Sequence, residues 1–226
     1  MKTTQVGKII RSKRKTLYLE VASDATLIVR APLHCSDTFI QEAVAGHLDW
    51  IYRRQKYIRE HCKPAVPKKY KAGEDFLYLG QLYKLSIIES SNAPLSFDGQ
   101  QFLIGINRLK DAKELFKSWY KQAAKQTFKE RVELASARTG ILYQKISINQ
   151  AKTRWGSCCG AKGKMNFTYR LIMAPLEVID SVVMHELVHI KVRNHSKEFW
   201  SKLNEFVTNY KKYHKWLKEN QNLLSL

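Results

Sequence analysis

The sequence contains no long apolar run. No stretch of its 226 residues approaches the ~18 uninterrupted apolar residues that a membrane-spanning helix needs. The first sixteen residues also lack the apolar segment of a secretory signal. We therefore expect a soluble, cytoplasmic protein with no membrane partner.

Cysteine is scarce and poorly spaced for a metal or redox site. The four cysteines form no CxxC pair, and the adjacent Cys158 and Cys159 could be joined only through a strained ring. This pattern argues against a disulfide framework and against thiolate ligation of a metal. We expect Cys35, Cys62, Cys158 and Cys159 to be reduced thiols that pack as small, buried hydrophobic residues.

Acidic residues are also few. The chain has 20 Asp and Glu against 39 Lys and Arg, a formal net charge of +19. Residues 151–226 hold 13 basic and 6 acidic residues, a poor supply of carboxylates for an oxygen-lined Mg²⁺ or Ca²⁺ site. The positive charge favours a polyanionic partner such as nucleic acid or a nucleotide, or else serves only to solvate the surface.

The remaining composition is that of a folded protein, with 44% hydrophobic and 26% charged residues. Apolar periodicity predicts an α+β protein with a basic N-terminal lobe, residues 1–72, and a catalytic domain, residues 73–226. The lobe should contain an antiparallel β-meander, with a turn at Ser23 and Asp24. One helix should follow over residues 36 to about 61, and then a proline-containing linker.

Hairpins and one long helix should open the catalytic domain. Turn residues predict hairpins at Leu79 and Gly80 and at Asp98 and Gly99, the second pair being the stronger signal for a type I′ turn. A helix is predicted over residues 110–138, with Gly140 as its terminating residue.

The last third should combine a small sheet with helices. Pro175 should open a helix that reaches about Lys191, the chain should reverse near Arg193 and Asn194, and Ser196 should cap another helix. Short strands are predicted over residues 146–149, 153–155 and 165–168, with a turn at 160–163.

The predicted helix after Pro175 carries an HExxH motif, His185-Glu186-Leu187-Val188-His189. Histidines four residues apart lie on one helix face, so both imidazoles can reach one metal ion. Glu186 would then act as general base and activate a metal-bound water. Imidazole ligands in a segment poor in carboxylates favour Zn²⁺ and a zinc-dependent hydrolase.

A third ligand is needed to complete such a site. His195 follows His189 at the spacing found in metzincins, although Val192 replaces the glycine at which metzincins turn. Glu198 and Glu205 are alternative ligands on the following helix. Glu198 could instead accept a hydrogen bond from a metal-ligating histidine and so orient it. The loop position of His195 favours the histidine.

The sequence resembles the YgjP-like metal-dependent hydrolases, a metallopeptidase-like family related to SprT-like zincins. The resemblance spans most of the chain. It rests on RWGSC at residues 154–158, Gly163, Asn166, Tyr169-Arg170-Leu171, Pro175, Asp180, Val182-Val183, His185 to His189, Asn194-His195-Ser196 and Phe199-Trp200, with Arg11 to Thr16, Ala31-Pro32 and Trp50-Ile51 nearer the N-terminus.

This resemblance implies a minimal zincin-like fold, in which the active-site helix packs on a twisted antiparallel sheet. It implies Zn²⁺ as the cofactor, with three histidine ligands and a glutamate base, at His185, His189, His195 and Glu186. It also implies a nucleoside triphosphate pyrophosphohydrolase activity towards uridine triphosphate, which has been assigned within the family.

Four polar residues near the motif are candidates for binding substrate. Arg154 or Arg170 could stabilise developing negative charge, or either could pair with Asp180 instead. Asn166 and Tyr169 could contact substrate, although Tyr169 could equally support the sheet. Trp155 and Trp200 are expected in the core.

Three functions fit this sequence. The first is a zinc peptidase-like hydrolase, with a peptide substrate lying along a sheet edge near residues 165–168. The second is the nucleotide hydrolase. The third is a nucleic-acid-associated, SprT-like protease that contacts nucleic acid weakly through the basic segments 53–59 and 210–218.

Overall fold

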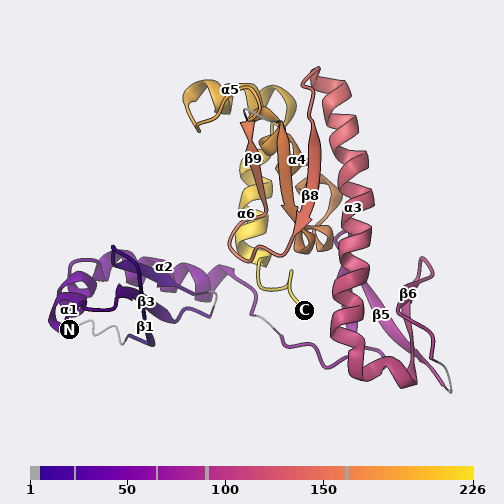
Figure 1. The fold of residues 1–226 in the computed structure, drawn as a ribbon, viewed down its shortest axis with the longest axis horizontal. Coiled ribbons are helices and arrows are strands. Elements are labelled where there is room, and N and C mark those ends of the chain that lie inside the picture. The colour runs from indigo at the N-terminus through magenta and orange to yellow at the C-terminus, as the bar shows by residue number, and fades with distance from the viewer. Residues whose placement is uncertain (1–5, 23, 65, 90–91, 161–162) are drawn as a thin grey trace. The chain divides into compact units, whose positions relative to one another are not determined.

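A computed structural model describes residues 6–22, 24–64, 66–89, 92–160 and 163–226. The chain forms two compact units (Figure 1). The first comprises Met1–Val66 together with Lys218–Leu223, and the second comprises Pro67–Leu217 together with Leu224–Leu226. Within the described residues, no helix is both long and apolar enough to cross a membrane.

The first unit holds a three-stranded sheet in the order β1-β3-β2, formed by Lys8–Ser12, Leu27–Pro32 and Tyr18–Val21. β2 and β3 are antiparallel, but β1 pairs with β3 in parallel, so the predicted antiparallel meander is wrong. The burial of β3 accounts for this order. Leu27, Val29 and Ala31 are at most 1% exposed, and the most apolar strand takes the centre of the sheet. Ser23 of the predicted turn lies outside the described residues.

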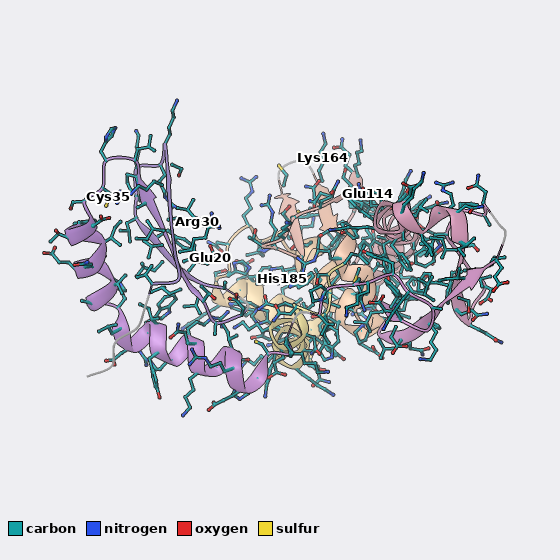
Figure 2. All side chains as sticks on the ribbon, turned by 90° about the horizontal axis from the view of Figure 1, so that it is seen from below. Glu20, Arg30, Cys35, Glu114, Lys164 and His185 are labelled. Atoms are coloured by element: carbon teal, nitrogen blue, oxygen red, sulfur yellow. The ribbon has the colours of Figure 1, made fainter. Side chains whose placement is uncertain are left out.

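Two helices replace the single predicted helix of this unit. Ser36 caps α1 (Asp37–Ala45) as expected, its hydroxyl accepting a hydrogen bond from the Phe39 amide at 3.2 Å. The helix ends at Gly46, and α2 (Leu48–His61) begins beyond it. Glycine disfavours a helix interior, which explains the break. Glu20 and Arg30 form an ion pair at 2.9 Å between β2 and β3 (Figure 2).

The second unit begins with a mixed four-stranded sheet in the order β4-β5-β7-β6. The strands are Asp75–Tyr78, Gln81–Ile88, Gln101–Gly105 and Ser96–Phe97. Both predicted hairpins are present. The two positive φ angles of a type I′ turn occur at Leu79 and Gly80, whereas among the residues of the other turn only Gly99 has one.

Helix α3 (Ala112–Thr139) runs along this unit and follows the 3₁₀ segment η1 (Ile106–Asp111) (Figure 1). The helix ends at Gly140 with φ of 67°, as predicted. Its fully buried side chains follow an i, i+4 stripe that forms the centre of the core: Phe116, Tyr120, Ala124, Phe128 and Val132.

A second sheet, in the order β8-β10-β9, precedes the histidine motif in the chain. Its strands are Lys145–Asn149, Lys164–Thr168 and Gly156–Cys159. β10 is parallel to β8 and antiparallel to β9, so the sheet is mixed and not antiparallel as expected. The strand predicted at residues 153–155 is wrong, because these residues lie in the loop before β9. In that loop the Ala151 amide donates to the Asn149 side chain, and the Arg170 side chain donates to the Lys152 carbonyl. Part of the predicted turn at 160–163 lies outside the described residues.

Helix α4 (Leu176–Val188) carries the HExxH motif. It follows the 3₁₀ segment η3 (Tyr169–Met173) and Pro175, and packs against α3 and β9. The β4–β5 turn supports its start: Gly80 donates to the Met173 carbonyl at 3.2 Å, and a Cβ at Gly80 would lie 2.8 Å from Pro175. Two further helices follow, α5 (Lys197–Phe206) and α6 (Tyr210–Asn220).

Candidate metal centre

Three imidazoles converge at the end of α4. The Nε2 atoms of His185 and His189 are 3.2 Å apart, and the Nε2 of His195 lies 3.0 Å and 3.2 Å from them. The side chain of His185 lies among the closely packed side chains of the second unit (Figure 2). The structure thus brings together the three histidines singled out from the sequence, with their nitrogens directed at one point.

The chain returns to this point without a left-handed residue. α4 stops at Val188, where Val192 donates a backbone hydrogen bond to the Val188 carbonyl at 3.0 Å. Arg193 and Asn194, near which the sequence predicts the reversal, are not among the non-glycine residues with positive φ in the described chain. Val192 is 8% exposed, so the side chain in place of the metzincin glycine packs into the core.

Val192 also orients one of the histidines. The Nδ1 atom of His189 lies 3.0 Å from the Val192 carbonyl, which can only accept a hydrogen bond. The proton of His189 is therefore on Nδ1, and the lone pair of Nε2 faces the other two imidazoles. The Val192 carbonyl therefore accepts the hydrogen bond from a metal-ligating histidine that the sequence left open for Glu198. Glu198 and Glu205 are exposed and do not belong to the metal-ligating group of the described residues.

Helix α5 packs two aromatic rings against the histidines. Phe199, which is fully buried, stacks on His189 with ring centroids 4.4 Å apart. Trp200 stacks on His195 at 5.4 Å. Ser196 caps this helix as predicted, accepting from the Phe199 amide at 3.4 Å. The helix ends at Phe206, and its first turn fixes the imidazoles that the loop and α4 supply.

His185 and His189 are held in the neutral form that binds metals. Burial, together with the nearby imidazoles of His189, His195 and His214, lowers the pKa of His185 to about 3. Burial also lowers the pKa of His189, opposed by its hydrogen bond to Val192. Neutral imidazoles keep the Nε2 lone pairs free for a divalent metal ion.

Glu186 lies beside the histidines and is buried, with 6% of its surface exposed. Burial raises the pKa of its carboxyl to about 7, and the positive charge of Arg154 opposes the rise. The carboxylate fits because residue 156 is glycine: a Cβ there would lie 2.6 Å from Glu186 Oε1. The sequence shows Gly156 as part of the RWGSC motif, but no pattern in it indicates this role.

The two arginines among the candidate substrate-binding residues occupy different surroundings. Arg154 is exposed and lies near enough to Glu186 to influence its pKa. Arg170 donates to the carbonyls of Leu224 at 2.5 Å and Lys152 at 3.1 Å, so it ties together two chain segments. Its guanidinium also lies 5.2 Å from the ring of Trp155.

Asn166 lies on β10, and Tyr169 begins η3. Asn166 alternates along β10 with Met165 and Phe167, which are fully buried, so its side chain is on the opposite face of the sheet. Tyr169 is 8% exposed and belongs to the core. Neither residue is among the described residues that line the cavity at the metal centre.

Asp180 has a partner that the sequence did not suggest. Arg131 of α3 binds it through two hydrogen bonds of 2.5 Å and 2.6 Å, which replaces the considered pairing with Arg154 or Arg170. This ion pair joins α3 to the middle of α4. It therefore helps to place the helix that carries the histidines.

The cysteines are free thiols, but they are not buried as expected. Cys35, Cys62 and Cys158 are half-buried and Cys159 is exposed. Burial raises the pKa of Cys158 to about 11, as does the nearby carboxylate of Glu186. A protonated thiol is a poor metal ligand, so Cys158 contributes bulk beside the site.

A buried glutamate lies next to three convergent histidines that could together hold a metal ion, which is the arrangement expected of an HExxH motif. A family model described as "YgjP-like, metallopeptidase domain" matches residues 15–220. The chain belongs to this family, whose members are metal-dependent, peptidase-like hydrolases. Comparison with curated proteins gives no match, and comparison with solved structures gives none.

Proposed function

We propose that the protein is a zinc-dependent, peptidase-like hydrolase in which Glu186 is the general base. The observation that carries this proposal is the convergence of three imidazole Nε2 atoms, 3.0–3.2 Å apart, beside the buried Glu186. Neither feature has a structural purpose of its own. A buried carboxylate and three clustered imidazoles cost stability unless they serve a ligand.

The donor set suits zinc. Tetrahedral zinc with nitrogen ligands at 2.0–2.1 Å places those nitrogens about 3.3 Å apart, close to the separations found here. Three nitrogens and no carboxylate among the described ligand group disfavour Mg²⁺ and Ca²⁺, which prefer oxygen. Three protein ligands also leave a tetrahedral ion with one open position, as in catalytic sites.

Zinc, when bound by His185, His189 and His195, would supply a Lewis acid and lower the pKa of water. Glu186 then performs the proton transfers. Its carboxylate, whose pKa is raised by burial, accepts a proton from the attacking water and delivers it to the nitrogen of the leaving amine. Gly156 gives the carboxylate the space for these transfers.

An extended peptide has a sheet edge available beside Glu186. Residues 165–168, the edge predicted from the sequence, belong to the central strand β10, which is hydrogen-bonded on both sides. In the described part of the sheet, β9 is an edge strand, and its first residue is Gly156. We propose that a peptide adds to this edge and so brings its scissile bond to the histidines.

The nucleotide alternative has weaker support. The described residues lining the cavity at the metal centre include no lysine or arginine that could neutralise a triphosphate. Weak association with nucleic acid remains a proposal that depends on the net charge of +19. We therefore retain peptide hydrolysis as the function.

A substrate panel tests the proposal. The zinc-loaded wild type, Glu186→Gln and the control Glu198→Gln, which alters an exposed glutamate of α5, are incubated with casein and with uridine triphosphate. We expect casein cleavage by the wild type and the control, and a rate at least about 100-fold lower for Glu186→Gln. Full activity in Glu186→Gln, or hydrolysis of the nucleotide alone, would contradict the proposal.

A further inference from the structure

A cavity of about 440 Å³ opens beside the candidate metal centre, within the second unit. The described residues around it come from β9 and the residue before it, from α4, from the loop after α4, and from α5 and α6. They include His185, His195 and Glu186 of the centre, and beyond these the wall is mainly apolar: Trp155, Val182, Trp200, Leu203, Tyr210 and Leu217.

One wall is a continuous aromatic stack. The ring of Trp200 lies between His195, at a centroid distance of 5.4 Å, and Tyr210, at 5.0 Å, with interplanar angles of 27° and 21°. The stack therefore leads from the metal centre to α6. Leu203 and Leu217, which are 1% and 4% exposed, provide buried aliphatic surface beside it.

The remaining wall is equally fixed. Val182 stands three residues before His185 on α4, so the two side chains are neighbours on one helix face. Trp155 is restrained by the guanidinium of Arg170, 5.2 Å from its ring. A surface preformed from rigid rings and short aliphatic side chains loses little entropy when it binds an apolar group.

The charges of the lining residues further restrict the class of ligand that the cavity can bind. Among the described lining residues Glu186 is the carboxylate and there is no lysine or arginine, although the chain has 39 basic residues. The exposed imidazole of His214 adds a polar group at the lining. Apart from a metal ion at the histidines, an anionic phosphate finds no cation among these lining residues, and a basic side chain finds no carboxylate apart from the general base.

We propose that this cavity binds one large apolar side chain of the peptide, aromatic by preference, at a residue flanking the scissile bond. This inference rests on the proposed peptidase function. The cavity opens at His185, His195 and Glu186, so a side chain within it places the adjacent amide at the reacting groups. Its volume lies in the range of specific ligand sites and accommodates a benzyl or indole group.

The preference is measured with quenched fluorescent peptides that differ at one residue beside the cleaved bond, on zinc-loaded full-length protein. We expect kcat/KM for Phe to exceed that for Gly by about 100-fold, and Lys and Asp to fall near Gly. Val182→Phe should lower the Phe to Gly ratio at least about tenfold by filling the cavity. The control Leu176→Phe, at a partly exposed position of the same helix, should keep the wild-type ratio.

A binding experiment separates this inference from the proposed function. Zinc-loaded Glu186→Gln is titrated with N-acetyl-phenylalaninamide, N-acetyl-glycinamide and uridine, following the intrinsic tryptophan fluorescence, to which Trp155 and Trp200 of the cavity contribute. Stronger binding of the phenylalanine derivative supports the inference even if no peptide is cleaved. The absence of cleavage would reject the proposed function alone.

Two results overturn the inference. One is peptide cleavage with no side-chain preference, or with a preference that Val182→Phe leaves unchanged, which keeps the peptidase and rejects the cavity. The other is binding of uridine at least as tight as that of N-acetyl-phenylalaninamide, or no binding of either, which assigns the aromatic wall to a nucleobase or to no ligand.

Discussion

Replacement of Gly156 by alanine should disable the general base while leaving the metal ligands intact. An alanine Cβ would lie 2.6 Å from Glu186 Oε1, 2.7 Å from its Cγ and 2.9 Å from its Cδ. Ordinary contact begins at 3.4 Å, so the carboxylate must retreat by about 0.8 Å. The φ of Gly156 lies outside the positive region, so the backbone itself accepts alanine.

The expected cost falls on catalysis more than on folding. A misplacement of about 1 Å at a reacting group lowers a rate on the order of 100-fold. The atoms that must move, Oε1, Cδ and Cγ, belong to one side chain and not to the backbone, so the free energy of unfolding should fall by only about 1–2 kcal/mol. The three histidines lie elsewhere on α4 and its loop, and zinc should remain at one ion per chain.

The assay compares Gly156→Ala with Ser157→Ala, which alters the next residue of β9. Casein cleavage, zinc content and a denaturant titration are measured on each. We expect kcat about 100-fold below wild type for Gly156→Ala and within about threefold for Ser157→Ala, with equal zinc. A Gly156→Ala protein that binds zinc and turns over at the wild-type rate would refute the packing argument.

Three further predictions concern the site. Zinc at 100 times its Kd should stabilise the wild type by about 2.7 kcal/mol in denaturant titrations and should hardly affect His189→Ala, whereas equal stabilisation would exclude this ligand. In the metal-free protein, the raised pKa of Glu186, about 7 against 4.5, means that ionisation opposes folding. The stability of wild type relative to Glu186→Gln should therefore fall by about 3 kcal/mol between pH 4.5 and 7, and a flat difference would contradict this. Tyr169→Phe should keep the cleavage rate within about twofold, because Tyr169 lies in the core; a loss above tenfold would return Tyr169 to the site.

Local patterns predicted the elements that local physics determines. The long α3 and its left-handed end at Gly140 follow from helical periodicity and from the freedom of glycine at positive φ. The i, i+4 spacing of His185 and His189 placed both imidazoles on one face of α4. His195 was reached by the same reasoning, although the path of the loop was not.

Pairing between strands could not be read from the sequence because it depends on distant residues. β1 pairs with β3 and not with β2, since burial of Leu27 and Val29 puts β3 in the centre. Leu79 adopts a positive φ of 48°, which its own side chain disfavours, because its amide and that of Gly80 bind η3.

The candidate site also combines features that local patterns predict with features that depend on distant residues. The sequence identified Glu186 from its motif, but the reason for Gly156 appears only where β9 meets α4. Val192 replaces a turn glycine without a left-handed residue because α4 ends early and the Val192 carbonyl binds His189. Glycine followed by serine in a short strand near an HExxH helix is the one sequence signal that could have indicated this close approach.

X-ray absorption at the zinc edge tests the central claim most directly. The zinc-loaded wild type should show three imidazole nitrogens at 2.0–2.1 Å and one further light atom. In His195→Ala one imidazole should be lost. A sulfur scatterer near 2.3 Å, which would place Cys158 on the metal, or fewer than three imidazoles in the wild type, would contradict the three-histidine centre.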